Sequence, residues 1–148
     1  MSQQLQESPV VTGLLYAEVQ HFYAHHMQLL DRGRDEEWAA TFTEDGSFLA
    51  PSLPEPVRGR ARLAAAVRRT AAQLAELGET HRHWHGMIDV TAGTGGELLV
   101  RCYAVIYAIP RGGEPRLHLT CVCEDVLVRG EGGELLVRDR RVTRDDQP

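Results

Sequence analysis

The second half of the chain consists of four strand-like runs joined by short, mostly glycine-rich connections. The runs cover residues 80–91, 97–109, 116–128 and 134–143, and the connections are residues 93–96, 111–114 and 130–133. Connections of this length join neighbouring antiparallel strands, because a crossover to a parallel strand needs about a dozen residues or more. The pattern therefore predicts an antiparallel sheet in which each strand pairs with the next.

The first half of the chain has the periodicity of helices. Residues 13–30 carry apolar side chains at intervals of three and four, and residues 60–77 repeat this spacing and end at Gly78. A short second helix is expected from Asp35, carrying Trp38 and Phe42. The sequence then predicts, in order along the chain, a turn at residues 44–46, a brief apolar run at residues 48–50 and a proline-rich loop at residues 51–56.

Helices followed by antiparallel strands are the order of an α+β fold. We expect three N-terminal helices packed on one strongly curved, mostly antiparallel β-sheet, forming a cone with an apolar interior that is open at one end. The chain has 148 residues, which fits one domain. We place this domain at residues 13–145, between a flexible N-terminus (residues 1–12) and a short tail (residues 146–148).

Composition excludes several classes of function. The formal net charge of -5 argues against binding of nucleic acid. All 16 basic residues are arginines, so neither a lysine Schiff base nor a P-loop is possible. No run approaches the roughly 20 apolar residues of a membrane helix, and the first residues lack the features of a secretory signal. We therefore expect a cytoplasmic protein that binds neither nucleic acid nor membranes.

The three cysteines, Cys102, Cys121 and Cys123, follow no zinc-ribbon or CxxC spacing. Two of them lie in an apolar, strand-like run. Buried, reduced thiols are the expected state of such residues.

Three of the seven histidines, His81, His83 and His85, alternate at the start of the first long strand. Side chains alternate across a strand, so these three share one face of the sheet. Histidine exchanges protons near neutral pH and is the commonest metal ligand. If this face lines a cavity, the row indicates proton transfer or, as a weaker alternative, a metal site; on a solvent face it would be only a polar strand.

Several local sequences resemble those of one known family. They lie at the end of the first expected helix (residues 30–31), in and after the short second helix (residues 35–38 and 42–46), before the third helix (residues 57–60), at the start of the first long strand (residues 80–84) and at the end of the last strand (residues 138–143). Together they are similar to NTF2-like proteins of the SnoaL-like group, and the resemblance covers about residues 13–145. This group includes polyketide cyclases, scytalone dehydratase, steroid isomerases and non-catalytic β subunits of oxygenases, so the resemblance implies the fold more firmly than the function.

The resemblance to the dehydratases carries over two catalytic positions, Asp31 and His83. In those enzymes an aspartate and a histidine at such positions form a pair inside the cone. A carboxylate beside an imidazole fixes its tautomer and raises its basicity, which suits proton transfer near neutral pH. The alternative is structural: Asp31 caps the turn into the second helix and His83 is a hydrogen-bonded core histidine.

The chain also departs from the dehydratase pattern. Leu30, Ala50 and a position near Tyr107 or Ile109 stand where the fungal enzyme has two tyrosines and a second histidine. Other polar side chains are then expected to contact the substrate: His26, His85, Tyr103, Tyr107, His118 and Glu124. Tyr103 and Tyr107 are the candidate oxyanion donors, since they share one face of a strand. The arginine-rich last strand is expected to be a solvated or partner-contacting edge.

The resulting hypothesis is a cofactor-free, metal-free cyclase, dehydratase or isomerase that acts on an aromatic or polyketide-type intermediate of specialised metabolism. Family members commonly dimerise through the outer face of the sheet, so a homodimer is expected. The competing hypothesis is a non-catalytic protein, either a ligand binder or a β-subunit-like scaffold partner of an oxygenase.

Overall fold

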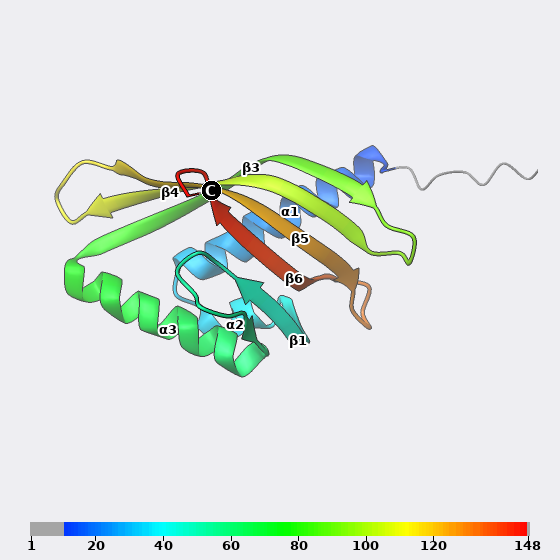
Figure 1. The fold of residues 1–148 in the computed structure, drawn as a ribbon, viewed down its shortest axis with the longest axis horizontal. Helices are drawn as coiled ribbons and strands as arrows, with labels where there is room; N and C mark the ends of the chain where they lie inside the picture. Colours follow the sequence, from blue (N-terminus) through cyan, green and yellow to red (C-terminus); the bar gives the residue numbers. More distant parts are fainter. Residues whose placement is uncertain (1–10, 148) are drawn as a thin grey trace, which may run out of the picture.

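A computed structural model describes residues 11–147 as three helices and one six-stranded sheet. The elements are α1 (Gly13–Asp31), α2 (Asp35–Ala39), β1 (Phe42–Leu49), β2 (Val57–Arg58), α3 (Arg60–Leu77), β3 (Glu79–Ala92), β4 (Leu98–Pro110), β5 (Arg116–Arg129) and β6 (Leu135–Arg144) (Figure 1). The predicted α+β class, the three helices and the four long strands are confirmed. The flexible N-terminus was expected at residues 1–12, of which residues 1–10 lie outside the described part of the chain, as does Pro148 of the tail.

The sheet has the strand order β2-β1-β6-β5-β4-β3. The four long strands form antiparallel pairs in chain order, as their short connections predict. β1 adds to the edge of β6 in parallel, and β2 pairs with β1. The sheet is therefore mostly antiparallel, with one parallel pair that the sequence did not reveal.

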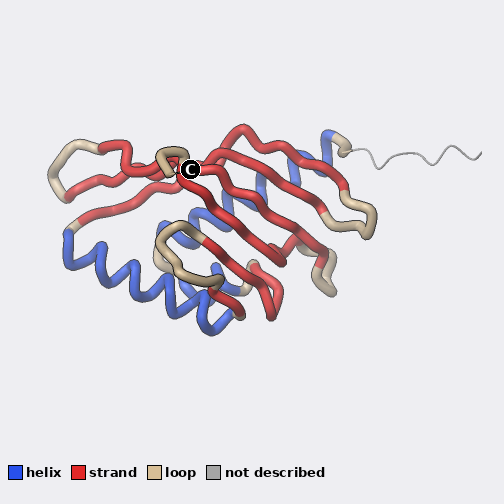
Figure 2. Tube along the Cα trace, viewed as in Figure 1, coloured by secondary structure: helices blue, strands red, loops and turns tan. Residues whose placement is uncertain are grey.

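The helices cover one face of this sheet and leave the other open. Figures 1 and 2 show α1 crossing behind the long strands and α3 lying along the lower end of the sheet. The Thr12 side chain caps α1 by accepting a hydrogen bond from the Leu15 amide at 3.1 Å. α3 ends at Gly78, whose φ of 64° belongs to the left-handed region that glycine adopts without steric cost.

The segment around β1 differs from the prediction. Phe42 begins a strand instead of extending the short helix, and the expected turn at residues 44–46 lies inside that strand. The register against β6 explains the difference, because it moves from Phe42↔Val137 to Ser47↔Asp139. The extra residues of β1 form a bulge, so their turn-like composition marks an irregular strand and not its boundary.

The core lies between the helices and the covered face of the sheet. Tyr23 of α1, Phe42 of β1, Leu63 of α3 and Leu127 of β5 are at most 2% exposed. Burial of each side chain of this size contributes about 1.5–3 kcal/mol. This core holds α1 and α3 across the sheet and leaves a hollow between them. Within residues 11–147, none of the helices combines the length and the apolar character needed to cross a bilayer.

Candidate active site

A cavity of about 740 Å³ lies between α1, α3 and the covered face of the sheet. Its walls are largely apolar, and its apolar side chains include Met27, Leu30, Phe48, Val67, Leu74, Ile106, Leu119 and Val142. Its polar side chains include Asp31 together with His81, His83 and His85 of β3, and Arg140 of β6. Apolar walls with a few convergent polar groups are typical of sites for small organic ligands.

Asp31 and His83 are joined through both carboxylate oxygens. Nδ1 of His83 lies 2.7 Å from Oδ1 of Asp31, and the His83 backbone N–H donates to Oδ2 at 3.1 Å. An ionised carboxylate only accepts hydrogen bonds, so Nδ1 carries the hydrogen and Nε2 of the neutral ring is left as a base. The Asp31 side chain is 8% exposed and that of His83 is 21% exposed, so the imidazole is the group that the cavity reaches.

The position of Asp31 is unfavourable for a helix and requires a compensating partner. It is the last residue of α1, where the helix dipole is negative and no basic side chain occupies the last turn. The two hydrogen bonds from His83 supply the compensation across 52 positions of sequence. The Asp31 carboxylate at the C-terminus of α1 is therefore stabilised by His83 of β3 and not by residues of its own helix.

The two neighbouring histidines also line the cavity, as the alternation on β3 predicts. His81 lies 3.7 Å from a carboxylate oxygen of Glu79 and its ring contacts that of His118, with centroids 5.1 Å apart. Burial, together with the nearby His118 and His83, lowers the pKa of His81. His118 itself is exposed and does not line the cavity; it is the extra residue of a bulge in β5 and sits beside His81 at the rim.

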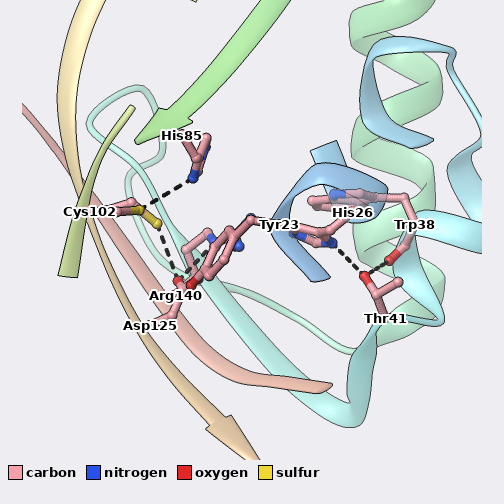
Figure 3. A network of polar contacts seen from close by, with 9 residues as sticks. Tyr23, His26, Trp38, Thr41, His85, Cys102, Asp125 and Arg140 are labelled. Atoms are coloured by element: carbon pink, nitrogen blue, oxygen red, sulfur yellow. Dashed lines mark hydrogen bonds and ion pairs between the residues drawn. The ribbon is translucent and has the colours of Figure 1, made fainter. Parts of the chain in front are cut away.

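Beyond His85, a polar network is buried in the core, and its Arg140 also contributes to the cavity lining. Arg140 donates to both oxygens of Asp125, from Nε at 2.9 Å and from Nη2 at 2.8 Å, and the Tyr23 hydroxyl donates to Oδ2 at 2.6 Å (Figure 3). Burial alone would raise the pKa of Asp125, but the Arg140 charge and these hydrogen bonds hold it below its usual value. Burial and the Asp125 charge raise the pKa of Tyr23 well above its usual value. The network therefore stays a closed ion pair with a neutral tyrosine.

Cys102 and Cys123 lie next to this network. Sγ of Cys102 is 3.5 Å from Nδ1 of His85, and Sγ of Cys123 is 3.3 Å from Oδ1 of Asp125. A hydrogen bond from Cys123 lowers the pKa of Cys102 to about 6, and the same bond raises the pKa of Cys123 well above its usual value. All three cysteines are free and buried, which confirms the expectation for these thiols.

His26 does not lie where the sequence predicted. It is 0% exposed in the core, stacked between Phe22 and Trp38, and it is absent from the cavity lining. Its Nδ1 lies 2.6 Å from the hydroxyl of Thr41, which donates to the Trp38 carbonyl, so Nδ1 is the protonated nitrogen (Figure 3). Burial and the nearby Arg140 lower the pKa of His26 well below its usual value. His26 is a neutral core residue and not a ligand contact.

Tyr103, Tyr107 and Glu124 occupy the outer face of the sheet instead of the cavity. Cys102 and Ala104 face the helices, so the side chain of Tyr103 between them points outward and is 49% exposed; Tyr107 is 40% exposed. Glu124 is exposed between the buried Cys123 and Asp125. The expected oxyanion donors were assigned to the wrong face, because periodicity groups residues on a strand without telling which face is covered.

Two buried charged residues, Asp125 and Arg140, were not predicted from the sequence. The last strand was expected to be a solvated edge, yet β6 is an interior strand of the sheet and Arg140 is 4% exposed. One signal was present: Cys121, Cys123 and Asp125 alternate, so a carboxylate shares the face of two buried thiols. A charge at such a position implies a buried partner of opposite sign.

Comparisons with known proteins agree with this architecture. Residues 13–141 match the family model described as the SnoaL-like domain. The fold is similar to ActVI-ORFA from Streptomyces coelicolor, with 34% identity, a TM-score of 0.85 and coverage of 91% of this chain and 98% of that chain. A protein from Catenulispora acidiphila in complex with S-DNPA is 32% identical, with a TM-score of 0.79 and coverage of 92% of this chain and 97% of that chain.

A more distant structure supports the fold alone. It is an NTF2-like protein with a cystatin-like fold from Novosphingobium aromaticivorans, 23% identical, with a TM-score of 0.76 and coverage of 90% of this chain and 83% of that chain. Among curated proteins, none matches this sequence. With a family match over residues 13–141, the chain belongs to the SnoaL-like family, and its three helices on one curved sheet form an NTF2-like fold.

Proposed function

We propose that this protein is a cofactor-free enzyme that moves a proton at a carbon next to a carbonyl in an aromatic, polyketide-type ligand. The observation that carries the proposal is the contact of 2.7 Å between His83 and Asp31 at the wall of the cavity. His83 acts as general base and then as general acid, and Asp31 orients it. Cyclisation, dehydration and isomerisation share this first step.

The shape and lining of the cavity support a small aromatic ligand. A volume of about 740 Å³ lies within the range of about 300–1,000 Å³ that small-molecule sites occupy. Apolar side chains from α1, α3 and the sheet surround this space, and Asp31 and His83 are among its polar side chains. The related protein from Catenulispora acidiphila binds S-DNPA, and we propose a ligand of that kind for this chain.

The chemistry follows from the tautomer of His83. Nε2 takes the proton of the substrate carbon, the C–H bond breaks, and its electron pair moves to the carbonyl oxygen to form an enolate. In an isomerisation the imidazolium returns that proton to another carbon. In a dehydration the enolate expels a hydroxyl group from the next carbon, and the imidazolium protonates it to water. Asp31 stabilises the imidazolium in both cases by accepting from Nδ1.

The test measures exchange of carbon-bound hydrogen with deuterium oxide by NMR, with 2-tetralone and S-DNPA as probes. The wild-type protein should accelerate exchange next to the carbonyl, and His83→Ala and Asp31→Asn should each slow it by about 10²–10⁴-fold. The matched control is His25→Ala, which removes an exposed histidine from α1. Circular dichroism establishes that each variant is folded.

Two results would contradict the proposal. Wild-type exchange rates in folded His83→Ala or Asp31→Asn would remove these residues from the reaction. A wild-type protein that binds S-DNPA but exchanges no hydrogen in either probe would be a ligand-binding or scaffold protein.

We further propose that the outer face of the sheet joins two copies of the chain. Trp84, Tyr103, Tyr107 and Leu117 are 40–71% exposed there, which is a large apolar surface for a lone subunit. Light scattering should give a dimer at micromolar concentration, and Trp84→Glu should convert it to a monomer. A monomeric wild-type protein would contradict the proposal.

A further inference from the structure

Three potential metal-ligand atoms lie close together beneath the cavity, and the proposed proton transfer uses none of them. Nδ1 of His85 and the sulfurs of Cys102 and Cys123 all lie within 4.8 Å of one another. Cys102 is 1% exposed and Cys123 is 0% exposed, whereas His85 lines the cavity. The cluster is therefore buried on the sheet side and reached from the cavity through the imidazole.

The register of three adjacent strands creates this cluster. Cys102 of β4 is paired directly with Cys123 of β5, so the two thiols stand side by side on the covered face. His85 of β3 pairs with Ala104, two residues along β4 from Cys102 and on the same face. Because the three ligands come from three strands that are paired with one another, their spacing is fixed by backbone pairing and not by flexible loops.

We propose that His85, Cys102 and Cys123 form a binding site for a zinc ion. Two thiolates and one imidazole are a donor set that zinc uses in proteins, at about 2.3 Å to sulfur and about 2.0–2.1 Å to nitrogen. Tetrahedral bonds of these lengths place sulfur and nitrogen about 3.6 Å apart. The separation between Sγ of Cys102 and Nδ1 of His85 is 3.5 Å, so this edge of the tetrahedron is already formed.

The charge balance of the buried region favours a divalent ion. Asp125 and Arg140 neutralise each other next to the cluster, with side chains 0% and 2% exposed. Zinc binding displaces the thiol protons of Cys102 and Cys123 into solvent, and one Zn²⁺ then cancels the two negative charges of the thiolates beside a neutral imidazole. A monovalent ion such as Cu⁺ would leave a net negative charge in a region where an unpaired charge is costly.

Two local features hold the imidazole in place for this role. Its ring stacks on Tyr23, with centroids 5.7 Å apart and an interplanar angle of 23°. A bulge follows immediately, between Gly86 and Asp89, where Met87 adopts a φ of 50°. Bulges re-aim side chains next to functional sites, and this one interrupts the regular pairing of β3 with β4 one residue after His85.

Three protein ligands leave one position of a tetrahedral zinc ion, which in catalytic sites holds water or substrate. The site is independent of Asp31, whose partner is His83. Loss of proton transfer in a His83 variant and loss of metal in a cysteine variant are therefore separate outcomes.

Cobalt(II) is the probe for this site, because cobalt bound tetrahedrally by thiolates shows sulfur-to-metal charge-transfer bands. The reduced, metal-free protein should bind one equivalent of cobalt(II) with these bands, and zinc(II) should displace it. Cys102→Ser and Cys123→Ser should weaken zinc binding by at least about 100-fold in competition with a chromophoric chelator. Serine at position 123 can still donate to Asp125, so that variant keeps its internal hydrogen bond.

Cys121→Ser is the matched control, since it removes the third buried thiol but no ligand and should bind zinc like the wild type. His85→Phe keeps an aromatic ring on Tyr23 and serves if a serine variant fails to fold. It should lose the same affinity as the cysteine variants. One equivalent of cobalt without charge-transfer bands, no binding by the wild type, or unchanged affinity in the folded ligand variants would overturn the site.

Discussion

Two carboxylates on the covered side of the sheet have opposite environments. Asp31 accepts from a histidine at the wall of an open cavity, whereas Asp125 accepts from an arginine and a tyrosine inside the core. Histidine changes its charge near neutral pH, and arginine remains protonated at every pH that a folded protein meets. The first pair can therefore gain and lose a proton during a reaction, and the second pair is a permanent part of the fold.

The comparison also separates what each pair contributes to stability. Water in the cavity can replace a missing partner of Asp31 or His83, because the side chains of these residues are 8% and 21% exposed, respectively. Arg140 also contributes to the cavity lining, but its side chain is only 2% exposed and that of Asp125 is 0% exposed, so water has little access to this pair. The chemistry proposed for this protein thus uses the pair whose disruption the fold tolerates.

The largest effect is expected from Asp125→Ala, which leaves the Arg140 guanidinium buried without its counterion. The free energy of unfolding should fall by about 3–5 kcal/mol, measured by urea denaturation. Asp31→Ala removes two hydrogen bonds beside the cavity and should cost only about 1–2 kcal/mol.

The double variant Asp125→Leu with Arg140→Met controls for the charge. It removes both charges and restores apolar volume, so it should recover most of the loss measured for Asp125→Ala. If Asp31→Ala proves as destabilising as Asp125→Ala, the distinction between a reactive pair and a structural pair fails.

The next largest effect is expected from the buried His26, which makes the stability depend on pH. Burial and Arg140 lower the pKa of His26 in the folded protein, whereas the unfolded chain protonates it around 6.5. The unfolded state therefore binds more protons as pH falls below 6.5, and the free energy of unfolding should fall by at most about 1.4 kcal/mol per pH unit from this group. Urea denaturation between neutral pH and pH 5 measures the slope.

His26→Phe should flatten this slope, because it keeps the stacked ring between Phe22 and Trp38 and removes the titrating group. His21→Gln is the control, because it removes an exposed histidine from the same helix and leaves the buried His26 in place. A slope that persists in His26→Phe would assign the acid sensitivity to another group.

Much of this architecture could be predicted from the chain. The helical spacing and glycine-rich connections predicted the long elements, and the alternation of His81, His83 and His85 predicted that they share a face. The pairing of Asp31 with His83 came from the family resemblance, because no local pattern links residues 52 positions apart.

The rest depends on facts that periodicity does not contain. Tyr103 has the same alternation whether it faces inward or outward, and only packing of the helices decides. Arg140 was expected at an edge because the parallel pairing of β1 with β6, which makes β6 an interior strand, has no local signal. Burial of a charge depends on a partner elsewhere in the chain, so a composition-based expectation places it at the surface.

The smallest effect is expected for a carboxylate pair at the surface, which extends the comparison to full solvent access. Glu18 of α1 accepts from Arg129 of β5, from Nη2 at 2.7 Å, and both side chains are more than 40% exposed. The hydrogen bond from Arg129 lowers the pKa of Glu18, so its contribution to stability is present above the unfolded pKa of about 4.5 and is lost as pH falls through the folded value.

Glu18→Gln should reduce the free energy of unfolding by only about 0.2–1 kcal/mol at neutral pH and by less in about 1 M salt, where the Debye length is about 3 Å. Glu131→Gln, an exposed carboxylate with no ion pair among the described residues, is the control for loss of charge alone. A loss at Glu18 as large as that of Asp125→Ala would mean that solvent access does not rank these three pairs, because the exposed pair would then stabilise the fold as strongly as the sealed one.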